Sequence, residues 1–255
     1  MTVLEIRNPF NALTLYEETV ESTMDVSRQL ALNGEPHGTV IAAGFQENGR
    51  GRIRGRAWRM EGNVNLPFTI LLRFPRIEDI PPALSLRAGL AVCLAIEDFV
   101  PFLKGKVMVK WPNDIITGSK KIAGILCEAD GGNVFIGVGV NVAQKIFPAP
   151  LAEKAASIAL VSGVDIAPEG RFYLLERILE RLYAELETAA GKDWKARLEQ
   201  RLYKKDEKVI FIEGAAGSGR EVHGHLAGIA EGGELLIADG QDVRSFTTGE
   251  LVFPC

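Results

Sequence analysis

The segment GRGRIRGRAW, at residues 49–58, gathers four arginines and three glycines into ten positions. An arginine side chain offers a planar fork of donors that matches a phosphate or a carboxylate. Glycine gives the backbone conformational freedom and lets main-chain N–H groups approach a ligand. Since the segment follows an apolar run at 38–45 that is typical of a buried strand, it predicts an anion-binding loop at a strand end.

The common phosphate-binding motifs do not describe this loop. The pattern GxxxxGK[ST] is absent, and no GxGxxG opens a helix here. A solvated basic loop and an RNA-binding patch therefore stay open as alternatives. Trp58 could stack on a base, although a tryptophan is more often a core residue. The net charge of −4 weighs against broad nucleic-acid binding, which needs a basic face.

A second polar cluster lies in VKWPNDIITGSKKIAGILCE, at residues 109–128. Asn113 and Asp114 follow an expected strand, and side chains at a strand end can face a pocket. Lys121 opens the next expected strand, across a hairpin-like connection. Strict alternation puts Lys121 on one face with Ala123, Ile125 and Cys127, and puts Ile122, Gly124, Leu126 and Glu128 on the other. The lysine could hold a substrate anion, or the stretch could be a charged hairpin tip.

Glycines mark a third stretch, IGVGVN at residues 136–141. Glycine weakens a strand unless something must approach closely. Because Gly137 and Gly139 point to the same face, either a flat ligand or a tightly packed helix is expected over that face.

The elements that position these residues follow from periodicity and chain breakers. Helices are expected at 22–34, 82–100 and 168–190, and strands at 38–45, 64–74, 107–111, 121–129 and 134–142. Pro67 cannot donate to a β-ladder, which predicts an edge or a bulge. From Lys208 onward, short strands separated by glycine-rich turns predict a small β-barrel. The expected fold class is α+β, with a catalytic domain at 1–205 and a barrel domain at 206–255.

Composition narrows the class of protein. Of the 255 residues, 47% are hydrophobic and 24% are charged, as in globular proteins. The three cysteines and three histidines lack metal-binding spacing, and a cytoplasmic location is the simplest expectation. No signal peptide is expected, and the longest apolar stretch, 88–96, is too short to span a membrane.

Taken in order, five blocks resemble the biotin–protein ligases: EST, QENGRGRIRGRAW, KWPND, KIAGILCE and GVGVN. The resemblance implies a central mixed β-sheet packed by helices, of the class II synthetase-like biotin–lipoate ligase type, with a C-terminal SH3-like β-barrel. It also implies two reactions. Biotin and ATP form biotinyl-5′-AMP, and biotin then passes to a lysine of a biotin carboxyl carrier protein. The alternatives are a lipoate or octanoate ligase or transferase of the same fold, and a non-catalytic adenylate-binding or RNA-binding module.

The resemblance also assigns site residues. The implied biotin-binding residues are Ser22, Thr23, Gln46, Gly49, Arg50, Gly51, Arg52, Lys121, Gly124, Leu126 and Gly137. The implied ATP-binding residues are Arg56, Trp58, Asn113 and Asn141, and the implied catalytic residues are Lys121, Arg52 and Asp114, with Mg²⁺ at Asp114.

Three departures from the family pattern stand out. Ile53 and Arg54 make the loop one residue longer, which leaves open which of Arg52, Arg54 and Arg56 faces the phosphates. Met24 stands where many members have asparagine, and Thr69 where many have serine.

The implied partners follow from the same resemblance. Only 20 residues precede the EST block, too few for the winged-helix domain of some members. No DNA binding and no membrane association are therefore expected. Family members occur as dimers and as monomers, so a homodimer is one state that the resemblance allows.

Overall fold

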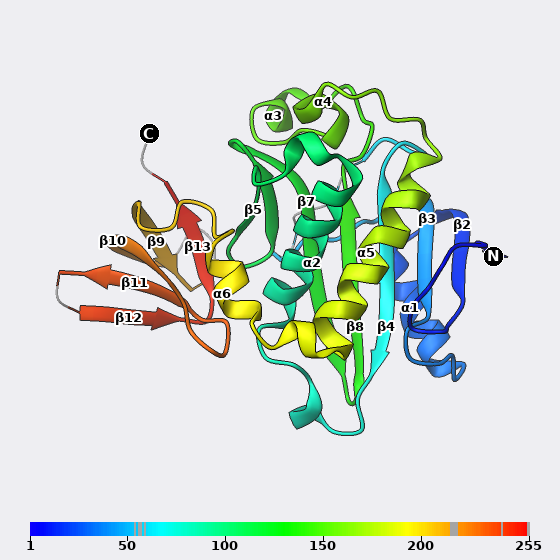
Figure 1. Ribbon diagram of the computed structural model, residues 1–255, viewed down its shortest axis with the longest axis horizontal. Coiled ribbons are helices and arrows are strands. Elements are labelled where there is room, and N and C mark those ends of the chain that lie inside the picture. Colours follow the sequence, from blue (N-terminus) through cyan, green and yellow to red (C-terminus); the bar gives the residue numbers. More distant parts are fainter. Residues whose placement is uncertain (54, 56–57, 59, 215–218, 241, 254–255) are drawn as a thin grey trace.

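An eight-stranded mixed sheet dominates the computed structural model of the chain (Figure 1), which describes residues 1–253 except 54, 56–57, 59, 215–218 and 241. Its strand order is β1-β2-β3-β4-β8-β7-β6-β5, and among the neighbouring strands of this sheet, as far as the structure describes it, only β2 and β3 run parallel. The strands are β1 (Thr2–Val3), β2 (Thr14–Val20), β3 (Val40–Gln46), β4 (Leu66–Arg73), β5 (Val107–Lys110), β6 (Asp114–Thr117), β7 (Lys120–Asp130) and β8 (Asn133–Val140). The mixed sheet confirms the α+β expectation.

The helices lie on both faces of this sheet. They are α1 (Thr23–Leu32), α2 (Leu84–Phe99), α3 (Ala149–Ala152), α4 (Ile158–Ser162), α5 (Gly170–Glu187) and α6 (Trp194–Glu199), with short 3₁₀ turns η1 (Ile77–Asp79), η2 (Pro101–Leu103) and η3 (Ala189–Gly191). Helices α2 and α5 pack together over one face, where Figure 1 shows them in front of the sheet. Helix α1 packs against β3, β4 and β8.

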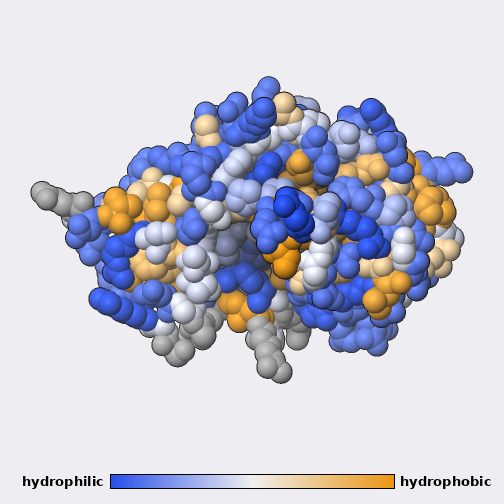
Figure 2. All heavy atoms as spheres, turned by 90° about the horizontal axis from the view of Figure 1, so that it is seen from below, coloured by the Kyte–Doolittle hydropathy of each residue, from blue (hydrophilic) through white to orange (hydrophobic). Residues whose placement is uncertain are grey.

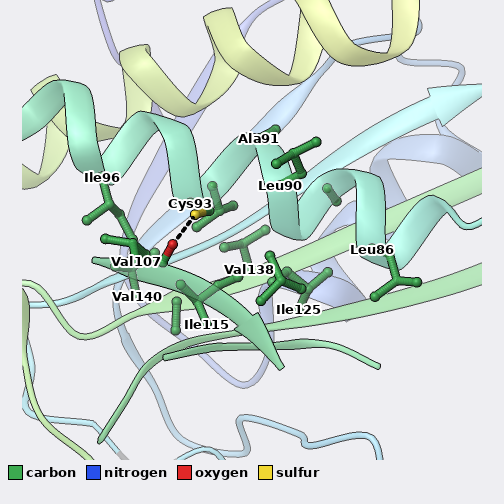
Figure 3. Close-up of a cluster of buried hydrophobic side chains, with 14 of the residues drawn as sticks. Leu86, Leu90, Ala91, Cys93, Ile96, Val107, Ile115, Ile125, Val138 and Val140 are labelled. Carbon is green, nitrogen blue, oxygen red and sulfur yellow. Dashed lines mark hydrogen bonds between the residues drawn. The ribbon is translucent and has the colours of Figure 1, made fainter. Parts of the chain in front are cut away.

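Alternation along the strands divides two hydrophobic layers. Phe68 and Ile70 of β4 belong to the large core that includes α2 and α5, whereas Leu71 packs with Met24 of α1. Figure 3 shows the first layer, in which the Cys93 thiol of α2 lies 2.9 Å from the Val107 carbonyl oxygen. Because one face is filled by long apolar helices, the α1 face is the one that carries polar groups and glycines.

Helix α2 is the core helix of the protein. The segment Ile77–Phe99 is long and apolar enough to cross a membrane by composition, with a mean hydropathy of 1.4. However, 61% of its most apolar window is buried, which is the pattern of a core helix in a folded domain. Burial also raises the pKa of the Cys93 thiol well above its ordinary range.

The structure corrects two expectations about the strands. The connection at 112–120 contains a strand of its own, β6, which pairs with both β5 and β7. Pro67 lies in β4, a central strand rather than an edge strand. The β3 ladder ends at Phe68, and Leu71 donates toward β3 through Thr39. Pro67 has the same orientation as Leu71, so its nitrogen faces β3 just beyond that ladder, where no donor is needed.

The C-terminal sheet is antiparallel, with strand order β12-β11-β10-β9-β13. Its strands are β9 (Lys208–Glu213), β10 (Arg220–Ile229), β11 (Leu235–Asp239), β12 (Asp242–Phe246) and β13 (Gly249–Val252). This is consistent with the expected SH3-like barrel, while the domain boundary at 205/206 stays a prediction. Trp111 joins the two sheets, because its Nε1 donates to the Gly233 carbonyl over 3.0 Å and its ring packs on Phe211.

Candidate active site

Two adjoining cavities lie on the α1 side of the large sheet. The smaller, of about 60 Å³, is lined by ten of the predicted biotin-binding residues: Ser22, Thr23, Gln46, Arg50, Gly51, Arg52, Lys121, Gly124, Leu126 and Gly137. The larger, of about 260 Å³, is lined by the predicted residues Trp58, Asn113, Asp114 and Asn141, together with Glu250 and Leu251 of β13. Figure 2 shows the molecule hollowed between its C-terminal part and its main body. Five residues line both cavities, namely Gly51, Arg52, Trp58, Asn113 and Lys121.

A buried hydrogen-bonded cluster closes one end of the smaller cavity. The backbone N–H and the hydroxyl of Thr23 lie 2.8 and 2.9 Å from Gln46 Oε1. The Thr69 hydroxyl lies 2.9 Å from that of Thr23. Ser22 is the N-cap residue of α1, and its side chain accepts no hydrogen bond from the helix. Thr23 and Gln46 were predicted to act at this cavity, whereas Thr69 was not.

Glycines of the large sheet line one side of the smaller cavity. A methyl group at Gly139 would lie 2.6 Å from Trp58 Cε2, and one at Gly137 would lie 2.8 Å from Met24 Sδ. Such distances leave no room for a side chain, so the glycines let Trp58 and α1 approach the sheet. Gly137 therefore lies under a tightly packed helix, which was one of the two alternatives, and Gly139 lies under the Trp58 ring. A flat ligand over this face stays a prediction.

A β-bulge turns Lys121 toward the cavities. Lys121 pairs with Ile116 and Ala123 pairs with Ile115, so Ile122 is an extra residue in β7. The expected strict alternation was therefore wrong at this point. Instead, Lys121 shares a face with Gly124, whose added methyl group would lie 3.1 Å from Lys121 Nζ. Ile122 is fully buried in the large core.

The Lys121 backbone is held by a segment distant from the five sequence blocks. Its N–H donates to the Lys154 carbonyl over 2.8 Å, and its carbonyl accepts from Ala156 N–H over 3.0 Å. Asn141 supports that segment, because its Nδ2 donates to the Ala156 carbonyl over 3.1 Å. No motif in the sequence pointed to residues 154–156, since their contribution is made by backbone groups.

The predicted polar pair at the strand end divides its tasks. Asp114 Oδ1 lies 2.5 Å from Lys121 Nζ. The Asn113 side-chain amide donates to the Ile125 carbonyl over 2.7 Å, and the backbone carbonyl of Asn113 accepts from Ile125 N–H over 2.9 Å. Asp114 is therefore the charged member that faces Lys121, while Asn113 ties the turn to β7.

The glycine-arginine loop is held at three points. Trp58 N–H donates to the Gly49 carbonyl over 2.8 Å. Arg50 pairs with Asp25 of α1 at 2.6 Å, and Arg52 donates to the Gly249 carbonyl of β13 over 3.0 Å. Gly49 lines neither cavity among the described residues, and it acts here through its backbone. Arg56, a predicted ATP-binding residue, and Arg54 lie outside the described residues. Which of Arg52, Arg54 and Arg56 faces the phosphates therefore stays open.

Comparison with known proteins identifies the family of the chain. Residues 16–142 match the model of the biotin/lipoate A/B protein ligase family. The chain is 30% identical over 224 residues to the biotin–[acetyl-CoA-carboxylase] ligase of Paracoccus denitrificans, a match that covers 84% of this chain and 89% of that protein. The biotin protein ligase of Aquifex aeolicus in complex with biotin and ATP has a TM-score of 0.75 and 28% identity, over 94% of this chain and 97% of that one.

The chain belongs to the biotin/lipoate A/B protein ligase family. Within that family its named relatives are biotin–protein ligases. A further relative is the bifunctional ligase/repressor BirA of Bacillus spizizenii, 33% identical over 185 residues and 68% of this chain. The match covers 54% of the BirA length, so this chain spans about half of that relative.

Proposed function

We propose that the protein is a biotin–protein ligase that forms biotinyl-5′-AMP from biotin and ATP and transfers biotin to a lysine of a biotin carboxyl carrier protein. The observation that supports this most strongly is the position of Lys121, which lines both cavities at their junction. A reaction that joins two anions needs a cation at the point where they meet. One cavity has the size and polar end for a small ring, and the other opens toward the C-terminal sheet.

In the first step a carboxylate oxygen of biotin attacks the α-phosphorus of ATP, and the bond to the leaving pyrophosphate breaks. Lys121 and Arg52 neutralise the negative charge that gathers on the phosphoryl oxygens. When the two substrates are held in adjoining cavities, they react without first having to meet in solution. This lowers the entropic part of the activation barrier. Among the described residues Arg52 donates one N–H to the Gly249 carbonyl, and a guanidinium carries further N–H donors that can meet an anion.

In the second step the acceptor lysine amine attacks the acyl carbon of the adenylate. The bond to the AMP oxygen breaks, AMP leaves, and the amine loses a proton as the amide forms. Water would compete for the same carbon. Arg50 of the glycine-arginine loop is bonded to α1 and Arg52 to β13, and Gly51, Arg52 and Trp58 line both cavities, which suits these residues to shield the adenylate.

Asp114 offers a carboxylate to a magnesium ion at this site. Among the described residues no three His, Cys, Asp or Glu side chains gather as a metal site. Mg²⁺ is often held by one or two carboxylates together with substrate phosphates and water, and Asp114 supplies one such carboxylate. When bound with ATP, the ion would neutralise phosphate charge. Asp114 would hold it beside Lys121.

The alternative substrates are lipoate and octanoate. Thr23, Gln46 and Thr69 form a polar end to the smaller cavity, and an alkyl or dithiolane group would offer no acceptor to the amide N–H groups of Gln46. The named relatives are likewise biotin ligases. The carrier protein as a partner, the expectation of no DNA binding and the possible homodimer stay predictions of the sequence.

A transfer experiment tests the proposed function. The protein is incubated with biotin, ATP and Mg²⁺, and a biotin carboxyl carrier domain is then added. We expect one biotin on one carrier lysine, detected by mass spectrometry, and no product when lipoate replaces biotin. Lipoylation at the same rate, or salt-sensitive RNA binding without any biotin transfer, would favour the alternatives.

A further inference from the structure

Thr69 is a buried polar residue that no sequence block assigns to the site. It lies in the middle of β4 with none of its surface exposed, on the face that α1 covers. Its hydroxyl is 2.9 Å from that of Thr23, which in turn is 2.9 Å from Gln46 Oε1. Thr69 therefore stands behind two residues that line the smaller cavity.

The direction of each hydrogen bond in this chain is fixed by one backbone group. The Thr23 N–H can only donate, so the Gln46 atom 2.8 Å from it is the amide oxygen. The Thr23 hydroxyl meets the same oxygen and must also donate. Its only proton is then used, so it accepts from Thr69. The chain runs from Thr69 to Thr23 to Gln46.

This direction decides what a ligand meets. With its oxygen occupied twice, Gln46 keeps two N–H donors on Nε2. The Thr23 oxygen keeps one lone pair. A pair of donors beside an acceptor matches the C=O and N–H of a urea, whereas a dithiolane ring has neither group.

We propose that Thr69 is a positioning residue that holds the Thr23 hydroxyl oxygen in place, so that its remaining lone pair stands beside the Gln46 N–H donors and selects a cyclic urea as the ring of the acyl substrate. The inference rests on the proposed function, since it names how that substrate's ring is recognised. Without the Thr69 proton, the Thr23 oxygen faces an apolar group, and its hydroxyl is no longer held toward Gln46. Gln46 stays bonded to the Thr23 backbone N–H, whereas the acceptor lone pair of the Thr23 hydroxyl loses its fixed place, and the ATP side of the site is unchanged.

Thr69→Val and Thr69→Ser test this inference, because valine keeps the shape and serine keeps the hydroxyl. Thr117→Val is the matched control, since the Thr117 hydroxyl is buried on β6 and has no partner among the described residues. We expect Thr69→Val to raise the calorimetric Kd and the KM for biotin about tenfold. The KM for ATP and the kcat at saturating biotin should stay within about twofold of the wild-type values, because Thr69 lies outside the ATP side of the site. Thr69→Ser should restore biotin binding.

The ring itself is tested with desthiobiotin, which keeps the cyclic urea and lacks the thioether ring. Its affinity should fall by the same factor as that of biotin in Thr69→Val, and octanoate binding should not fall. Unchanged biotin affinity in Thr69→Val, or equal losses for biotin and ATP that serine does not rescue, would overturn the inference. If Thr69→Val does not fold, weakened urea binding by Thr69→Ser would contradict the inference and retained binding would support it. Failure of the wild-type protein to bind biotin at all would instead overturn the proposed function.

Discussion

The Lys121 ammonium and the Asp114 carboxylate form an ion pair at 2.5 Å, at the junction of the two cavities. The two side chains are 32% and 27% exposed. Partly exposed pairs contribute at most about 1 kcal/mol to stability. The main consequence of the pair is therefore the position of the ammonium, which stands where the carboxylate and the α-phosphate would meet.

Replacing Asp114 by asparagine separates these two effects. We expect the free energy of unfolding to change by less than about 1 kcal/mol. Adenylate formation should fall by about tenfold or more, with a raised KM for MgATP. The reason is that asparagine lacks the carboxylate charge that would hold Mg²⁺ beside the phosphates and that positions the Lys121 ammonium. Denaturant melts and initial rates measure the two quantities. Asp165→Asn is the control, since Asp165 pairs with Lys145 on the surface; an equal loss of activity in both variants would contradict the role of Asp114.

Gly139→Ala tests the glycines that line the smaller cavity. The added methyl group would lie 2.6 Å from Trp58 Cε2, so the indole must move away from the sheet. Because misplacement of a group at a reacting site is costly, adenylate formation should fall about 10–100-fold, and the Trp58 fluorescence should change. Gly62→Ala is the control, since its methyl group would lie at an ordinary 3.6 Å from Phe45. Full activity of Gly139→Ala would show that the close approach of Trp58 is not needed.

Trp111→Phe tests the connection between the two sheets. The substitution removes the Nε1 donor and leaves the Gly233 carbonyl without that bond, which should cost about 1 kcal/mol of unfolding free energy. The C-terminal sheet contributes Glu250 and Leu251 only to the larger cavity. The KM for ATP should therefore rise more than the Kd for biotin. Equal changes in both constants would contradict this division.

The buried Cys93 thiol predicts a pH dependence of stability. Burial raises its pKa in the folded protein above the ordinary value of 9.0, so the folded state keeps a proton that the unfolded state loses. The contribution of this group is present below about pH 9.0 and falls as the pH rises further, by up to about 1.4 kcal/mol per pH unit. Urea melts from pH 7 to pH 10 should show this slope, and Cys93→Ala should reduce it. An unchanged slope in Cys93→Ala would contradict the assignment.

The sequence predicted the main elements and many of the residues that line the two cavities, because many of them lie at a strand end, a helix start or a glycine-rich stretch. Alternation failed at Lys121, since a bulge depends on the register of β6 against β7 and leaves no mark in the composition of either strand. Thr69 was noted only as a departure from the family pattern. Its role depends on Thr23 from another element, and a pairing between distant segments is not visible in local spacing.

The contribution of the C-terminal sheet was equally hidden. The Gly249 carbonyl holds Arg52 through a backbone atom, which any residue type could supply. The same is true of the Lys154 carbonyl and the Ala156 N–H at Lys121. Side-chain chemistry could be read from residue types, whereas backbone partners required the folded chain.

Biotin-dependent exchange of labelled pyrophosphate into ATP tests the central claim most directly, since it reports the adenylation step without a carrier protein. The wild-type protein should catalyse exchange only when biotin is present. Lys121→Ala should lower the rate by roughly 10²–10³-fold, the loss typical of one electrostatic stabiliser, with an unchanged Tm. Lys145→Ala, which removes a surface ion pair, should exchange like the wild type. Exchange without biotin, or a wild-type rate in Lys121→Ala, would contradict the account.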